Sequence, residues 1–226
     1  MSNDKILQRG KIIVLSGPSG VGKTTVCNML RQTIPNLIWS VSVTTRPLRE
    51  GEIEGKDYYF VSDAEFKKKL ENQEFLEYAL VHDHYYGTLK APVEQGLQAG
   101  NHYLLEIDVQ GGQNVKKQKP NDTMLIFIAP PSIDALRQRL IARNRDSTEV
   151  IEKRIRNATR ELEQSNSYDY IVVNINLDQT VVEVCSIVKK ALHYPGPISA
   201  KDTLLKRLLQ RIILCIKSVL KRLLKK

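Results

Sequence analysis

Cysteine is scarce in this sequence, and its spacing excludes several kinds of site. The 226 residues include only three cysteines, Cys27, Cys185 and Cys215, whose separations suit neither a metal site nor a redox pair. We therefore expect them to be small buried or tail residues of a protein in a reducing compartment. Residues 1–10 are polar and lack the apolar core of a signal peptide, which predicts a cytoplasmic protein.

Residues 1–200 carry almost no net charge. The total is +9 at pH 7, but residues 201–226 contain nine Lys or Arg and one Asp, so that segment alone carries +8. The remaining residues carry only +1, with basic and acidic side chains in nearly equal number. A broad nucleic-acid-binding face is therefore not expected, and nucleic acid is not among the predicted partners.

Repeats and low-complexity segments are absent, and strand-like and helix-like stretches alternate instead. This alternation predicts an α/β fold with a parallel sheet covered by helices. The expected strands cover residues 11–16, 37–43, 57–61, 75–81, 102–107, 124–129 and 170–174, with a short strand or turn at 84–87. The expected helices cover residues 23–33, 63–71 after a Ser62 cap, 92–98, 111–117, 133–142 after a Ser132 cap, 148–165 and 181–192. Short strands before residue 102 indicate an inserted lobe.

A glycine-rich loop follows the first expected strand. Residues 17–24 match the pattern G-x-x-x-x-G-K-[ST] between an apolar run and a helix-like stretch, the context of a phosphate-binding loop. Backbone N–H groups of such a loop, together with the helix N-terminus, surround an anion. Lys23 is predicted to reach the outer phosphates and Thr24 to ligate Mg²⁺ directly. The predicted triphosphate contacts are Gly17, Pro18, Ser19, Gly20, Val21, Gly22, Lys23, Thr24 and Thr25.

Two arginines in the next loop predict a phosphorylated acceptor. Arg46 and Arg49 lie three residues apart in a proline-containing loop, and forked guanidinium donors suit a dianionic phosphate. Tyr58 adds a hydroxyl donor in the following strand. The alternative for the charge pattern alone is a pair of solvated surface arginines.

The motifs that follow make a family resemblance specific. The sequence contains S-x-T-T-R-x-x-R-x-G-E-x-x-G-x-D-Y-x-F, then F-L-E, Y-Y-G, L-E-I-D-V-Q-G and I-A-P-P-S, in that order. Over about residues 10–192 it resembles guanylate kinases, which phosphorylate GMP or dGMP with ATP and Mg²⁺. The resemblance implies a P-loop core in a domain of residues 1–200, an NMP-binding lobe at about 40–96 and a mobile lid at about 139–154.

The resemblance also implies an acceptor site. Arg46, Arg49 and Tyr58, with Tyr86, would hold the GMP phosphate, and Ser42, Glu77, Thr88 and Asp108 would surround the guanine. Glu52 and Gly87 also belong to the implied GMP site. The chemistry agrees, because guanine presents two donors at N1 and N2 that a carboxylate can accept. A hydroxyl of Ser42 or Thr88 could donate to O6. Asp108 could hold a magnesium-bound water, contact the base amine, or do both.

The catalytic residues implied by the resemblance are Lys23, Arg139, Arg143 and Arg154. Phosphoryl transfer needs mainly alignment and neutralisation of charge on the equatorial oxygens, which these cations supply. Asn174 is expected near the adenine. The sequence departs from the family pattern at Asn144 and Ile175, where glycine and aspartate are usual, so the lid hinge and ATP affinity could differ.

Residues 201–226 extend beyond the resemblance and predict a basic amphipathic helix. At 100° per residue one half of the helix is apolar, with Leu204, Leu205, Leu208, Leu209, Ile212, Ile216, Val219, Leu220 and Leu223. Arg207, Gln210, Arg211, Lys217, Lys221 and Lys225 occupy the other half. Such a helix is predicted to lie on an anionic membrane, at the inner surface of the cell membrane. Packing on the body or on a second copy, and binding of acidic partners, are the alternatives.

Three other functions remain open from sequence. Residues 108–111 match the D-x-x-G of GTPases, but no Asn-Lys-x-Asp motif follows, and the acceptor arginines would then have no function. A guanylate-kinase-like binding module would keep the fold and lose the phosphate loop, which is intact here. A P-loop kinase for another small phosphorylated acceptor is the strongest alternative.

Overall fold

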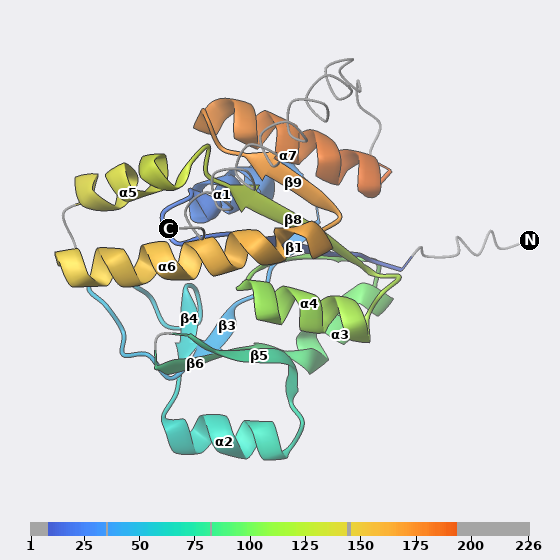
Figure 1. The fold of residues 1–226 in the computed structure, drawn as a ribbon. Helices are drawn as coiled ribbons and strands as arrows, with labels where there is room; N and C mark the ends of the chain where they lie inside the picture. The colour runs from blue at the N-terminus through green and yellow to red at the C-terminus, as the bar shows by residue number, and fades with distance from the viewer. Residues whose placement is uncertain (1–8, 35, 82, 144–145, 194–226) are drawn as a thin grey trace, which may run out of the picture.

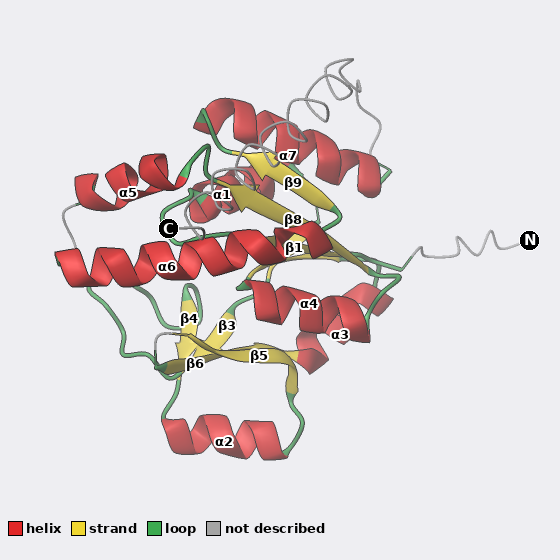
Figure 2. Cartoon of the chain, in the orientation of Figure 1, coloured by secondary structure: helices red, strands yellow, loops and turns green. Residues whose placement is uncertain are grey.

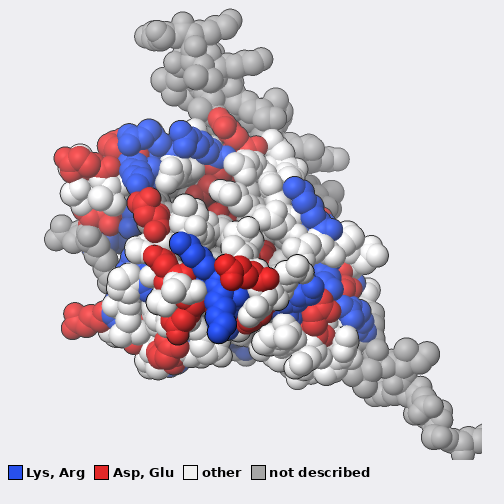
Figure 3. All heavy atoms as spheres, turned by 90° about the horizontal axis from the view of Figure 1, so that it is seen from below, with Lys and Arg blue, Asp and Glu red and all other residues white. Residues whose placement is uncertain are grey.

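The computed structural model describes residues 9–34, 36–81, 83–143 and 146–193. The predicted linker at 194–197, the amphipathic segment at 201–226, Cys215 and Asn144 lie outside the described residues. Among the described helices, none is both long and apolar enough to cross a membrane. On the face seen in Figure 3, basic and acidic side chains are interspersed, which agrees with the nearly neutral charge of the body.

A parallel five-stranded sheet forms the core, as the alternation of elements predicts. Its order is β2-β7-β1-β8-β9, so the first strand lies in the middle (Figure 2). All its described strand pairs are parallel. The strands are β1 (Ile12–Ser16), β2 (Leu37–Trp39), β7 (His102–Glu106), β8 (Thr123–Ala129) and β9 (Tyr170–Val173).

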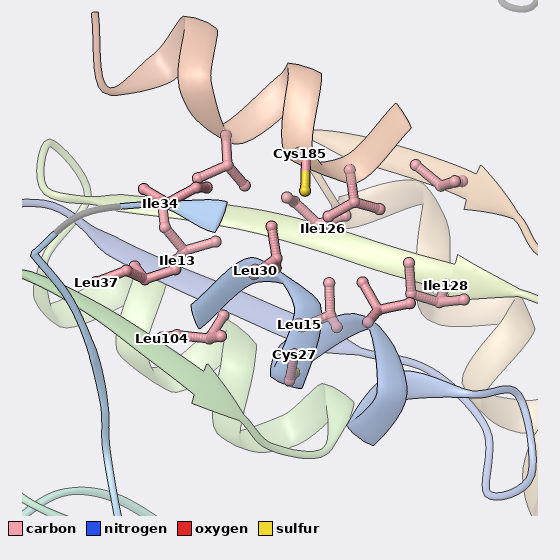
Figure 4. Close-up of a cluster of buried hydrophobic side chains, with 14 of the residues drawn as sticks. Ile13, Leu15, Cys27, Leu30, Ile34, Leu37, Leu104, Ile126, Ile128 and Cys185 are labelled. Carbon is pink, nitrogen blue, oxygen red and sulfur yellow. The ribbon is translucent and has the colours of Figure 1, made fainter. Parts of the chain in front are cut away.

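Helices cover both faces of this sheet because β1 is apolar on both. Ile13 and Leu15 face α1 (Lys23–Thr33) and α7 (Leu177–Ala191), where Cys27 and Cys185 are buried as predicted (Figure 4). Ile12 and Val14 belong to a second cluster, built with α3 (Lys90–Gln98) and α4 (Val109–Gln118). These two helices lie on the side of the sheet opposite to α1 and α7 (Figure 1). Burial on both faces is typical of a parallel sheet.

The predicted lobe is a separate mixed sheet with the order β4-β3-β6-β5. Its elements are β3 (Ser42–Thr44), β4 (Tyr58–Phe60), α2 (Asp63–Glu71), β5 (Phe75–Val81) and β6 (His84–Leu89). Phe66 of α2 stacks on Phe75 and Tyr85, which gives the lobe its own small core. The predicted capping box is confirmed, since Ser62 and Glu65 each hydrogen-bond the other's backbone N–H.

Two predicted boundaries are wrong. Residues 37–43 are not one strand: β2 pairs with β7 in the core sheet, whereas β3 pairs with β4 and β6 in the lobe. The chain therefore passes between the two sheets at residues 40–41. The last helix begins at Leu177 and not at Val181, because Asn176 Oδ1 accepts hydrogen bonds from the N–H groups of Asp178 and Gln179.

The lid region contains two helices that pack on each other. They are α5 (Ile133–Ala142), capped by Ser132 as predicted, and α6 (Thr148–Gln164), capped by Ser147 and followed by the short helix η1 (Ser165–Ser167). Their contact is a compact apolar cluster made by Leu136, Leu140, Ile151, Ile155 and Ala158.

Leu104 offers a test of this core. It lies in β7 between β1 and β2 and is fully buried, so Leu104→Ala should lower the free energy of unfolding by about 2–5 kcal/mol in urea titrations. Leu80 of edge strand β5 is 56% exposed. Leu80→Ala should therefore change the free energy of unfolding by less than about 0.5 kcal/mol. Equal losses in both variants would contradict the assignment of the core.

Candidate active site

The phosphate loop joins the end of β1 to the first turn of α1. Gly17, Gly20 and Gly22 have φ values of +144°, +90° and +100°, a region that favours glycine. At Gly17 a Cβ would lie 2.2 Å from the carbonyl oxygen of Ile128, so the loop also touches β8 closely. The start of α1 has neither a capping side chain nor an acidic residue, which leaves its first N–H groups available to an anion.

Lys23 is folded back over this loop. Its Nζ donates hydrogen bonds to the carbonyl oxygens of Gly17 at 2.5 Å and Pro18 at 3.2 Å. An ammonium group has three N–H donors, so one remains for a phosphate oxygen. The loop thus orients its own lysine; the role of Lys23 toward the outer phosphates stays a prediction.

The acidic partner of Thr24 is Glu106, a residue that the sequence reasoning missed. The Thr24 hydroxyl donates to Glu106 Oε1 at 2.9 Å. Glu106 ends β7, the strand next to β1, and both strands end at the same edge of the sheet. An acid at the end of a buried strand is a signal in the sequence, but the same signal also fits Asp108, two residues further on, which is the acid predicted above for the metal side.

These two oxygens fit a Mg²⁺ ion that arrives with a nucleotide. Cis ligands of an octahedral Mg²⁺ with bonds of about 2.1 Å lie roughly 3 Å apart, and hydroxyl and carboxylate oxygens are the donors that it prefers. Among the described residues no cluster of three or more His, Cys, Asp or Glu could hold a metal. Phosphates and water would therefore have to supply most of the ligands.

Asp108 has a structural contact within the site. It is the N-cap of α4, where its Oδ1 accepts from the Gly111 N–H at 2.8 Å. Its charge also acts on Lys23 and on Glu161 of α6, a second acid that the sequence reasoning missed. Burial raises the pKa of both carboxyl groups above their ordinary values.

Glu77 is the most deeply buried acid of the predicted guanine site. Its side chain is 5% exposed, and its Oε1 accepts from the Thr88 hydroxyl at 2.6 Å. Burial raises the pKa of the Glu77 carboxyl from 4.5 to about 7; the Thr88 hydrogen bond opposes this shift and the charge of Asp108 adds to it. A Cβ at Gly111 would lie 2.5 Å from Glu77 Oε2, so the lobe and α4 meet here.

The two predicted hydroxyl donors differ in their surroundings. Thr88 gives its hydrogen to Glu77, which makes it a partner of the carboxylate in this structure. Ser42 is half-buried in β3, opposite Tyr58, and its hydroxyl makes no hydrogen bond to the described residues. Ser42 is therefore the better candidate to donate to guanine O6.

Arg46 is buried in the lobe and held by Glu52. Its Nη1 and Nη2 donate to the two oxygens of Glu52 at 3.0 and 2.7 Å, and its guanidinium lies 5.2 Å from the ring centre of Tyr58. The hydrogen bond from Arg46 lowers the pKa of Glu52. This pair fixes the arginine, because Arg46 is buried and removing the half-buried Glu52 would leave its charge without this partner. Glu52 thus orients Arg46; its predicted contact with GMP stays a prediction.

The remaining residues of the predicted phosphate side lie around Arg46. The rings of Tyr58 and Tyr86 lie 5.9 Å apart. Glu52, and to a smaller extent Tyr86, raise the pKa of Arg46. Burial raises the pKa of Tyr58 to about 12, which keeps its hydroxyl a donor at neutral pH. Arg49 is exposed, but its N–H donates to Glu52 Oε2 at 2.8 Å. Gly87 is buried in β6 opposite Val43.

Two of the three lid arginines contact the core. Arg154 of α6 donates from Nη1 to the Ser19 hydroxyl of the phosphate loop at 2.7 Å and from Nη2 to Asp146 at 3.0 Å. Arg139 of α5 donates to the backbone oxygen of Asn174 at 2.8 Å. Arg143 caps the end of α5 and is exposed. The structure therefore brings Arg139 and Arg154 to the loop side of the site, whereas Arg143 lies at the lid surface.

Asn174 supports the phosphate loop. Its side chain is 4% exposed; Nδ2 donates to the Val21 carbonyl at 2.7 Å and Oδ1 accepts from Thr180 at 3.1 Å. With both ends of the amide occupied, its contacts are structural in this conformation. Its predicted approach to the adenine stays a prediction.

Glu77 gives a stability prediction with a defined sign. Between pH 4.5 and about 7 the native state binds more protons at this group than the unfolded chain, so its contribution to stability falls as pH rises. Glu77→Gln keeps an acceptor for Thr88 and removes the buried charge. Relative to wild type, the free energy of unfolding of the variant should rise little at pH 4.5 and by up to about 3 kcal/mol at pH 8, as measured by urea titration.

The control is Glu50→Gln, which removes an exposed carboxylate from the neighbouring loop. If Glu77→Gln changes the free energy of unfolding by the same amount at pH 4.5 and at pH 8, the pKa of Glu77 is not raised.

Known proteins share this arrangement along most of the chain. The protein-family model described as guanylate kinase matches residues 9–191. A guanylate kinase of Helicobacter pylori is 44% identical over 182 residues, which cover 80% of this chain and 88% of the relative. One from Bradyrhizobium diazoefficiens is 46% identical over 186 residues, covering 82% and 85%.

A solved structure agrees with the fold as well. The crystal structure of guanylate kinase from Anaplasma phagocytophilum superposes with a TM-score of 0.69 at 35% sequence identity and covers 82% of this chain and 87% of that one. With the family model matched from β1 to α7 and with relatives above 40% identity, the chain belongs to the guanylate kinase family.

Proposed function

We propose that this protein transfers the γ-phosphoryl group of ATP to GMP or dGMP, giving ADP and GDP or dGDP, as a step of purine nucleotide metabolism. The observation that carries the proposal is the buried Glu77 at the junction of lobe and core, with Thr88 and Asp108 beside it. Family membership supports it independently.

The base specificity follows from the chemistry of Glu77. Guanine offers donors at N1 and N2, and an ionised carboxylate can accept from both. Adenine presents an acceptor at N1, so Glu77 would face a lone pair in a buried site. Polar mismatches of this kind discriminate by roughly 10⁴-fold. The Ser42 hydroxyl would donate to O6; Ser42 lies in β3, which β6 separates from the Glu77 strand β5 in the same sheet.

The acceptor phosphate would lie against the arginine side of the lobe. Arg46, fixed by Glu52, and the exposed side chain of Arg49 would neutralise its charge, while the hydroxyls of Tyr58 and Tyr86 would donate to its oxygens. This division explains why one arginine is buried and oriented and the other is exposed: the second can follow the ligand.

The donor would bind in the phosphate loop. Residues 17–25 would hold the triphosphate, and Thr24 with Glu106 would hold Mg²⁺, which neutralises phosphate charge and orients the transferred group when it is bound. Lys23, Arg139 and Arg154 would stabilise the charge of the transferring group, and Arg143 would join them if the lid moves inward. Arg154 already reaches Ser19 in the loop.

Two alternatives are less well supported. A binding module without catalysis would not require the intact phosphate loop and its oriented lysine. A kinase for another phosphorylated acceptor would not require a buried carboxyl group opposite the base. Neither alternative accounts for both features.

An acceptor panel tests the proposed function. In a coupled assay with ATP and Mg²⁺, GMP and dGMP should be phosphorylated with kcat/KM values at least about 10³-fold above those of AMP, UMP and CMP. Glu77→Gln should reduce this preference, since its amide N–H₂ group would face the N2 donor of guanine. Faster turnover of AMP than of GMP would overturn the proposal.

The metal assignment has its own test, which separates Glu106 from Asp108. Glu106→Gln should raise the Mg²⁺ concentration needed for half-maximal activity by about 10-fold or more, because Thr24 loses its charged partner. Asp108→Asn should mainly raise the KM for GMP. If Asp108→Asn shifts the Mg²⁺ requirement and Glu106→Gln does not, Asp108 is the acid on the metal side.

We further propose that residues 201–226 place the enzyme at the inner surface of the cell membrane, on the basis of their +8 charge and apolar stripe. The full chain should sediment with liposomes rich in anionic lipid, less so at high salt, and a 1–196 variant should stay in the supernatant. Equal pelleting of both would exclude the membrane role. Self-association of the full chain alone, measured by sedimentation velocity without lipid, would favour packing between copies.

A further inference from the structure

A cavity lies beside β2, the edge strand of the core sheet, and none of the residues of the proposed reaction lines it. Its volume is about 750 Å³, within the range of small-molecule sites. Its wall includes Asn28, Arg31 and Gln32 of α1, Trp39 of edge strand β2, and Gly55 and Lys56 of the lobe. We call it the Trp39 cavity.

The Trp39 cavity is basic. Arg31 and Lys56 line it and no acidic residue does. Within the described part of the chain neither cation has an ion-pair partner. The two carboxylates nearest to Lys56 in sequence do not pair with it. Glu54 accepts a hydrogen bond from the Phe60 N–H, and Asp57 accepts one from the Ile53 N–H. The two cations are thus available to an anion.

The cavity also offers a platform for a flat ring. Trp39 is half-buried against the core cluster, and the Arg31 guanidinium lies 5.4 Å from its ring centre. Aromatic faces and guanidinium planes both accept a stacked base. Asn28 and Gln32, four residues apart on one face of α1, add amide donors and acceptors at the rim.

We propose that the Trp39 cavity is a second nucleotide-binding site, in which the base lies against Trp39 and Arg31 and the phosphates lie between Arg31 and Lys56. None of its lining residues belongs to the ATP or GMP site proposed above. The ligand class is a nucleoside di- or triphosphate, since a chain of phosphates can contact both Arg31 of the core and Lys56 of the lobe while the base lies against Trp39.

Its position makes this site regulatory. Arg31 belongs to the core, Lys56 belongs to the lobe, and the chain crosses from one sheet to the other at residues 40–41, next to Trp39. A ligand that contacts both cations fixes the lobe relative to the core. Acceptor binding, which also uses groups of both parts, then depends on the second ligand, and the dependence is reciprocal.

The experiment uses Trp39 as its own reporter, because it is the single tryptophan of the sequence. Full-length protein is titrated with ATP, GDP, guanosine and inorganic phosphate while tryptophan fluorescence is recorded. The variants are Arg31→Ala/Lys56→Ala, the charge-matched control Lys67→Ala/Arg156→Ala on exposed helix positions, and Lys23→Ala in the phosphate loop.

The nucleotides should quench Trp39 with saturation, while guanosine and phosphate alone should do so at least 10-fold more weakly. Arg31→Ala/Lys56→Ala should weaken the quench at least 10-fold, and the control and Lys23→Ala should leave it within twofold. If Lys23→Ala weakens the quench and Arg31→Ala/Lys56→Ala does not, the signal comes from the active site and the proposal is overturned. The absence of a quench by either nucleotide overturns it as well.

Kinetics tests the regulatory part and separates it from the proposed reaction. At fixed ATP, added GDP should change the KM for GMP differently in wild type and in Arg31→Ala/Lys56→Ala, whose KM without added GDP should stay within twofold of wild type. Identical responses overturn regulation. Failure to phosphorylate any acceptor would defeat the proposed function and leave the fluorescence result standing.

Discussion

The parallel pairing of β1 with β7 and β8 is the constraint on which the core half of the site depends. Parallel strands end at the same edge, so the loop after Ser16, the carboxylate of Glu106 and the turn after Ala129 are brought side by side. The contact of Gly17 with Ile128 and the hydrogen bond of Thr24 with Glu106 both follow from this register. The lobe then adds the acceptor groups from a second sheet.

The site concentrates charge that folding alone would not favour. Glu77, Asp108 and Glu161 all have a raised pKa because burial disfavours their charged forms. Arg46 is buried with one bidentate partner. Buried charges of this kind are not placed to maximise stability, and groups with a perturbed pKa cluster at functional sites. Their arrangement fits the proposed recognition of two donors of a base and the oxygens of a phosphate.

Local patterns were enough to predict much of this structure. The capping box at Ser62 and the phosphate loop depend on residues a few positions apart, and both are where the sequence places them. The division of residues 37–43 between two sheets depends on strand partners that lie 16 to 65 residues further along the chain. Choosing Glu106 over Asp108 required knowing which carboxylate points at Thr24 and which caps a helix. No pattern along the chain contains that information.

The Thr88–Glu77 pair has a consequence for the pH dependence of acceptor binding, if Glu77 reads the base as proposed above. A carboxyl group with a pKa of about 7 is partly protonated at neutral pH, whereas accepting hydrogen bonds from guanine N1 and N2 requires the ionised form. In the proposed role of Glu77, acceptor binding would release part of a proton to solvent, and the heat of binding would vary with the ionisation enthalpy of the buffer. Acidification would then weaken acceptor binding without a dedicated sensor.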